Sequence, residues 1–116
     1  MARRRWQVRL TVEAEQDVVS IIAWTRRTFS ASQARRYNET IIRAAAILAN
    51  GPSALGSVAR DGVRPGIRTL HIARSGRAGR HLLVYRQAGD TLITVLRILH
   101  DAMDLAQHLP ADDDAE

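Results

Sequence analysis

The chain has 116 residues and a formal net charge of +5, and it contains no cysteine. This length suits one domain with a single core, and the lack of cysteine excludes a disulfide framework and thiolate metal sites. No apolar run approaches the ~18 residues of a membrane span, so we expect a protein of the reducing cytoplasm.

The charge is unevenly distributed along the chain. All 17 basic residues are arginines, and residues 1–109 hold all of them against eight acids. The last seven residues carry four acids and no base. A body this basic is attracted to nucleic acid or to an acidic protein partner. We expect residues 1–109 to form a single domain and residues 110–116 to be an acidic, disordered tail.

The first elements follow from a change of hydrophobic period. Apolar and polar residues alternate over residues 6–12, which predicts a half-buried strand. Its expected buried face consists of Trp6, Val8, Leu10 and Val12. From Glu13 the apolar residues recur at helical spacing as far as Phe29, which predicts a helix with acids in its first turns.

A second helix is predicted directly after the first. Ser30 and Ser32 are both suitable N-caps, and Asn50-Gly51-Pro52 supplies the glycine and proline that end a helix. Because only a few residues separate the two helices, we expect them to form an antiparallel hairpin.

The second half of the chain indicates a sheet. Residues 51–66 are rich in turn-forming glycine and proline. The expected strands cover residues 67–74, 81–87 and 91–99, and a short helix follows at 102–109. The predicted fold class is α+β: an N-terminal strand, an antiparallel helical hairpin, a three-stranded antiparallel meander completing a four-stranded sheet, and a short C-terminal helix. We expect the first strand to pair as an edge or neighbour of the meander.

Five arginines fall on or beside the predicted strands of the meander: Arg68, Arg74, Arg80, Arg86 and Arg97. Together they could bind phosphates or the carboxylates of a partner. Singly, each could instead pack its stem over apolar surface or pair with a nearby aspartate. Arg97 interrupts an apolar strand, so its charge must be paired or reach an exposed face. We expect Asp101 or Asp104 as its partner, with a bound phosphate or a partner carboxylate as the alternative.

The end of the last strand carries a His-Asp pair. We expect His100 and Asp101 to end the strand and cap the terminal helix, while Met103 and Leu105 close the core. In an alternative role, Tyr85 and His100 could act as acid and base in RNA cleavage. The sequence has no phosphate-binding glycine loop, nucleophile elbow, HExxH motif or two-metal carboxylate cluster. We therefore predict no cofactor and no metal.

Four segments, in order, resemble the RelE/ParE superfamily of type II toxins: "TVEAEQDVVSIIAWTRRTFSASQARRYNETI", "RPGIRTLHIAR", "HLLVYR" and "VLRILHDAMDLAQHL". The resemblance extends from Trp6 to Leu109, and the His-Asp ending followed by "MD" is more similar to the ParE branch. It implies a helical hairpin on an antiparallel sheet. It also implies a hetero-oligomer with a cognate antitoxin that neutralises the toxin.

The two branches imply different targets. ParE-like toxins stabilise plasmids and arrest growth by binding DNA gyrase, with no chemistry of their own. RelE-like toxins are ribosome-dependent mRNA ribonucleases, and the residues that could match that role here are Arg68, Tyr85, Arg97 and His100. The absence of lysine departs from the lysine-rich RelE active site. A third possibility is a plain nucleic-acid-binding module, but the few aromatic residues count against binding along a single strand. We predict a ParE-like gyrase inhibitor, with the RelE-like ribonuclease as the alternative.

Overall fold

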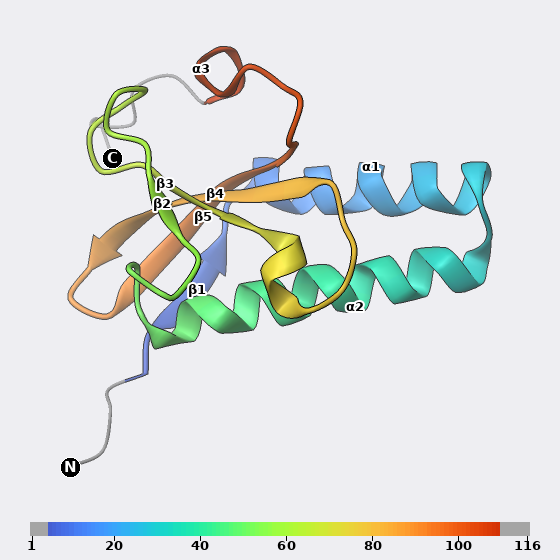
Figure 1. Ribbon diagram of the computed structural model, residues 1–116, viewed down its shortest axis with the longest axis horizontal. Helices are drawn as coiled ribbons and strands as arrows, with labels where there is room; N and C mark the ends of the chain where they lie inside the picture. The colour runs from blue at the N-terminus through green and yellow to red at the C-terminus, as the bar shows by residue number, and fades with distance from the viewer. Residues whose placement is uncertain (1–4, 110–116) are drawn as a thin grey trace.

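The computed structural model describes residues 5–109, and the predicted acidic tail at 110–116 lies outside them. A strand, a helical hairpin and a sheet follow one another along the chain (Figure 1). The elements are β1 (Gln7–Leu10), α1 (Val12–Thr28), α2 (Ala31–Ile47), β2 (Val58–Ala59), β3 (Arg68–His71), β4 (His81–Gly89), β5 (Leu92–His100) and α3 (Leu105–His108). Two short 3-10 turns cover Leu48–Asn50 and Ile72–Ser75. The predicted α+β class is confirmed.

Local signals set the ends of the hairpin helices. The Thr11 hydroxyl accepts the Ala14 N–H at the start of α1, and the Ser30 hydroxyl accepts the Gln33 N–H at the start of α2. Gly51 ends the 3-10 turn that follows α2, and its φ of 117° is a backbone conformation that favours glycine. The predicted hairpin is confirmed, and its two helices run side by side in Figure 1. No helix within residues 5–109 is both long and apolar enough to cross a bilayer.

The sheet has five strands in the order β1-β5-β4-β3-β2, one more than predicted. Strand β1 forms one edge and pairs in parallel with β5, while the other pairs are antiparallel. The additional strand, β2, lies in the turn-rich segment and has only two residues, too few to show an alternating pattern. The strand predicted at 67–74 is shorter, because the His71 imidazole accepts the Ala73 N–H and a 3-10 turn begins at Ile72.

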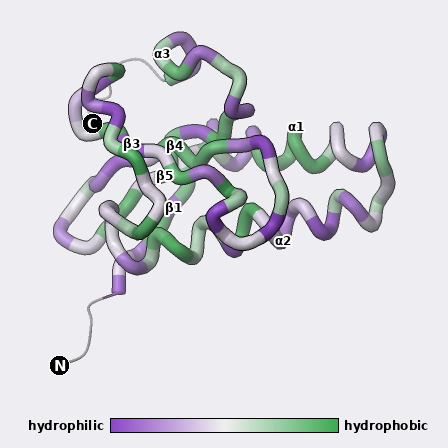
Figure 2. Tube along the Cα trace, viewed as in Figure 1, coloured by the Kyte–Doolittle hydropathy of each residue, from purple (hydrophilic) through white to green (hydrophobic). Residues whose placement is uncertain are grey.

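The core consists of two hydrophobic clusters. The larger one joins the hairpin to the sheet: Ala14, Ile41, Ala44, Leu48, Leu70, Ile72, Leu83, Tyr85, Ile93, Val95 and Ile98. The smaller one contains Ile67, Val84, Leu96 and Leu99, with Leu105 and Leu109 packed against it. Hydrophobic and hydrophilic residues alternate along both hairpin helices in Figure 2, as expected of helices with one face on a core. Because Leu105 packs against the smaller cluster, it covers the core as predicted.

Three residues predicted as apolar core are exposed. Val12 is the first residue of α1 rather than the last of the strand, and it is 63% exposed. Phe29, 66% exposed, caps α1 at the hairpin turn. Met103, 47% exposed, lies in the turn between β5 and α3 and does not close the core. Each lies at an element boundary, where a periodic pattern no longer fixes the direction of a side chain.

Candidate functional site

Arg97 is held by Asp17, not by Asp101 or Asp104 as predicted. The guanidinium donates to both carboxylate oxygens, from Nε to Oδ2 at 2.7 Å and from Nη2 to Oδ1 at 2.9 Å. Its Nη1 also donates to the carbonyl oxygen of His108 at 2.9 Å. Asp17 is available because α1 packs against β5. The pair joins α1, β5 and the C-terminal helix, and it raises the pKa of Arg97.

Asp101 forms the centre of a second cluster. Arg80 donates from Nε at 3.2 Å and from Nη2 at 3.2 Å, and His71 Nε2 lies 3.0 Å from the carboxylate. The bonds from Arg80 and then His71 lower the pKa of Asp101 to about 2. The prediction that Asp101 caps the terminal helix is wrong: the cap is Asp104, which accepts the Ala106 N–H at 3.1 Å. The turn after β5 places α3 three residues later than expected.

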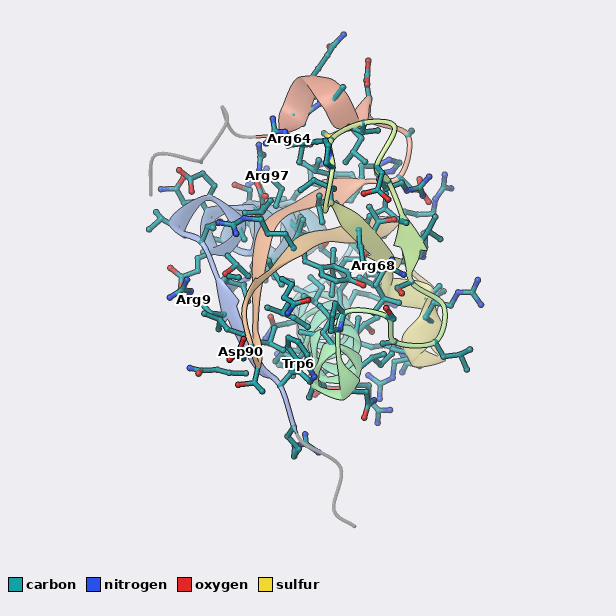
Figure 3. The ribbon with its side chains drawn as sticks, turned by 90° about the vertical axis from the view of Figure 1, so that its left-hand side faces the viewer. Trp6, Arg9, Arg64, Arg68, Asp90 and Arg97 are labelled. Atoms are coloured by element: carbon teal, nitrogen blue, oxygen red, sulfur yellow. The ribbon has the colours of Figure 1, made fainter. Side chains whose placement is uncertain are left out.

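A third group of arginines lines a hollow of about 710 Å³ beside β3 and β4, called the arginine-lined hollow below. Arg64, Arg68 and Arg86 line it together, beside one acid, Asp61. Arg68 Nη2 donates to the Ser57 hydroxyl at 2.8 Å. Figure 3 shows Arg64, Arg68 and Arg97 on this side of the molecule. The hollow can receive a carboxylate or phosphate from a partner.

Arg74 lies elsewhere. It is exposed in the 3-10 turn after β3, and its stem passes close to Gly56, where a Cβ would come within 2.9 Å of Arg74 Cδ. The five predicted arginines thus do not form one surface. Arg68 and Arg86 line the arginine-lined hollow, whereas Arg74, Arg80 and Arg97 lie outside it.

The structure does not bring the four ribonuclease candidates together. Tyr85 is fully buried, and its hydroxyl donates to the carbonyl oxygen of Pro52 at 2.6 Å. His100 pairs in register with His81, four residues along β4 from Tyr85, a separation of roughly 13 Å. Arg97 is engaged by Asp17. Tyr85 and His100 are thus not placed to serve one substrate as acid and base.

Sequence reasoning missed an apolar groove between the hairpin helices. Its volume is about 670 Å³, and its apolar lining consists of Val18, Val19, Ile22, Ala23, Ala31 and Ala34. Arg26, Arg27 and Arg35 lie along it. Val19 is 69% exposed and therefore available to a partner. The signal present in the sequence was that Val19 and Ala23 fall beside the expected core stripe, with arginines flanking them.

Comparison with known proteins adds the family. A family model described as the ParE toxin of the type II toxin–antitoxin system parDE matches residues 8–105. The chain belongs to the ParE toxin family. Toxin ParE of Escherichia coli is 34% identical over 100 residues, which cover 86% of this chain and 89% of that protein.

The other matches are shorter or more distant in sequence. Toxin ParE1 of Mycobacterium tuberculosis is 43% identical over 49 residues, 42% of this chain, and the match spans less than half (44%) of that relative's length. A solved structure of the chromosomal ParDE system of P. aeruginosa covers 84% of this chain and 97% of its own chain with a TM-score of 0.66 at 22% identity. The M. tuberculosis RelBE2 toxin–antitoxin complex covers 83% of this chain and 98% of its own with a TM-score of 0.54 at 22% identity. Both structures share the fold of this chain.

Proposed function

We propose that the chain is the toxin of a type II toxin–antitoxin pair, and that it arrests growth by binding DNA gyrase. Membership of the ParE family supports the toxin role. The placement of Tyr85 favours a binding toxin over a ribonuclease. Tyr85 is buried, its hydroxyl is hydrogen-bonded to Pro52, and it lies apart from His100. What the chain offers a target instead is a basic surface with an arginine-lined hollow.

The hairpin groove suits the cognate antitoxin. Its apolar lining can bury one face of an amphipathic segment, while the arginines along it can pair with acids on the partner. Both solved neighbours belong to toxin–antitoxin systems. A partner bound here would form a hetero-oligomer and leave the arginine-lined hollow on a different part of the surface.

The first test of this function is induced expression in a bacterial host, with pulse labelling of DNA and protein synthesis. Gyrase inhibition predicts an early loss of DNA synthesis, filamentous cells and continued translation. An immediate stop of protein synthesis with cleaved mRNA would contradict the proposal and favour the ribonuclease alternative. A gyrase target would require a cytoplasmic toxin, and fractionation of the expressing cells checks this expectation.

A second test uses purified DNA gyrase and two matched variants. Arg68→Gln removes a cation from the arginine-lined hollow, whereas Arg43→Gln removes an exposed cation from α2 outside it. We expect Arg68→Gln to reduce inhibition of supercoiling about tenfold, as for the loss of one charge-assisted contact. Arg43→Gln should inhibit as the unmodified chain does. Equal loss in both variants would indicate an effect of overall charge rather than of the hollow.

A further inference from the structure

A further pocket lies where the turn of the hairpin meets the segment between β3 and β4. Its volume is about 780 Å³, within the range of small-molecule sites. Its lining includes Trp24, Phe29, Arg36, Tyr37, His81 and His100. Two exposed aromatic rings, two imidazoles and the Arg36 guanidinium thus line one pocket together.

The aromatic rings give the pocket a stacking surface at the hairpin turn. Trp24 is 52% exposed although it lies in a helix, and its ring contacts that of Phe29 edge to face with centroids 5.8 Å apart. This contact holds the indole in place while leaving much of its surface open. An exposed, fixed indole is suited to stacking with a planar ring.

Polar side chains from α2, β4 and β5 also line the pocket. Tyr37 Oη accepts the Arg80 N–H at 3.0 Å and lies 2.6 Å from His81 Nδ1. With that backbone bond in place, the phenol O–H can donate to His81 Nδ1, an arrangement in which the imidazole proton is on Nε2. Burial and the neighbouring His100 lower the pKa of His81 to about 4, so the ring stays neutral at pH 7.

His100 is fixed in the same way. Its Nδ1 accepts the Ala102 N–H at 3.1 Å, which leaves the proton of the neutral ring on Nε2. The two imidazole rings contact each other edge to face with centroids 5.5 Å apart. Both histidines line the pocket, and a neutral imidazole N–H can donate a hydrogen bond to an anion.

The charge of the pocket is positive. Arg36, Arg77 and Arg80 line it, and no acid does among residues 5–109. Arg77 is paired with Glu39 and Arg80 with Asp101. Within the described part of the chain, the Arg36 guanidinium has no hydrogen bond or ion pair, and the residue is exposed. An unpaired cation beside two N–H donors matches a phosphate.

We propose that this pocket binds one nucleoside monophosphate, with the base stacked on Trp24 and the phosphate held by Arg36, His81 and His100. The nucleotide is either free or the 5′-phosphorylated end of a strand. The site accommodates a single nucleotide, which agrees with the scarcity of aromatic residues for a longer stacked strand. Its residues differ from those of the arginine-lined hollow and of the groove between the hairpin helices, so this proposal and the proposed function are tested separately.

The chain offers a clean optical test. It has two tryptophans, and Trp6 lies at the other end of α2, where its backbone N–H donates to Ala49. In the full-length Trp6→Phe variant, fluorescence reports Trp24 alone. We expect 5′-AMP to quench it with saturation, and adenosine or inorganic phosphate to bind at least about tenfold more weakly. Calorimetry of AMP binding to the unmodified chain gives the same answer if Trp6→Phe does not fold.

Further ligands and variants sharpen the outcome. Arg36→Gln should weaken AMP binding about tenfold while Arg43→Gln, two helical turns along α2 and outside the pocket, leaves it unchanged. The dinucleotide pApA binding as well as AMP assigns the site to strand ends, whereas binding about tenfold weaker assigns it to free nucleotides. The proposal is overturned by an absence of quenching and heat at about 10 mM AMP. It is equally overturned if adenosine or the aromatic carboxylate indole-3-acetate binds as tightly as AMP.

Discussion

Two arginine–aspartate pairs lie near the C-terminal end of β5, and they differ in how much water reaches them. In the Arg97–Asp17 pair the side chains are 25% and 15% exposed, whereas in the Arg80–Asp101 pair they are 71% and 23% exposed. Each aspartate accepts hydrogen bonds from two nitrogens of its arginine. Similar hydrogen-bond chemistry therefore occurs in two different dielectric surroundings.

The surroundings assign different roles to the two pairs. Asp17 also accepts the backbone N–H of Ile98 at 2.9 Å, so it satisfies a strand as well as a side chain. Arg80 is largely solvated, and its backbone, rather than its charge, contacts Tyr37. We infer that the first pair stabilises the fold, while the second contributes little to stability and shapes the surface beside the histidines.

The largest effect is expected from Asp17→Ala. It leaves the Arg97 guanidinium and the Ile98 N–H without their acceptor in a poorly solvated position. The free energy of unfolding should fall by about 3 kcal/mol, and urea denaturation followed by circular dichroism measures it. In a double-mutant cycle, Arg97→Met added to Asp17→Ala should recover part of the loss because no charge is then left unpaired. A loss below about 1 kcal/mol would place this pair with ordinary surface pairs.

The next effect concerns packing beside the Arg80–Asp101 pair. A Cβ on Gly79 would lie 2.5 Å from Ile72 Cδ1 and 3.3 Å from the Tyr37 hydroxyl. Ile72 is fully buried and cannot easily move aside. Gly79→Ala should therefore cost about 2 kcal/mol, as overpacking does. Gly62→Ala is the control, since its Cβ would meet nothing within 4 Å, and its midpoint in urea should not change. Equal stability of both variants would show that this corner is loosely packed.

The sequence predicted what is local and missed what is distant. Ser30, Gly51 and Asp104 act through neighbours within three residues, and such caps can be recognised from residue type and spacing; two of these three were predicted. Asp17 lies 80 residues from Arg97 along the chain. The sequence predicts Asp17 only as one of the acids that suit the start of the first helix. Its neighbours in sequence do not indicate which strand α1 packs against.

The candidate pocket was missed for a related reason. In sequence, Tyr37 fits the apolar pattern of the second helix, and it does pack against the larger core cluster. Only the tertiary structure shows that its hydroxyl reaches His81, 44 residues away. Amphipathic side chains such as Tyr fit a hydrophobic pattern while directing a polar atom elsewhere.

The histidine beside the exposed pair should give stability a pH dependence. The pKa of His81 is lowered from 6.5 to about 4 in the folded state, so the unfolded chain binds more protons between these values. Stability should therefore fall as pH decreases from 6.5 to 4 and show no further loss from this group below 4. The groups around His81 that act on it are Tyr37, Asp17, His71, His100 and Asp101. Urea unfolding across this range checks the slope, and His81→Gln should flatten it; an unchanged slope would assign it to another group.

The smallest effect at neutral pH is expected from Asp101→Asn. Arg80 is well solvated, so the loss of stability at pH 7 should be well below that of Asp17→Ala. The pKa of Asp101 is lowered from 3.8 to about 2, so its stabilising contribution is present above pH 4 and disappears as pH falls towards 2. Asp101→Asn should remove this acid limb. Because the Debye length falls from roughly 10 Å at 0.1 M salt to about 3 Å at 1 M, salt should reduce the effect of Asp101→Asn more than that of Asp17→Ala. If both substitutions cost the same and respond equally to salt, solvent exposure does not distinguish the two pairs, and their different roles must come from the backbone N–H that only Asp17 accepts.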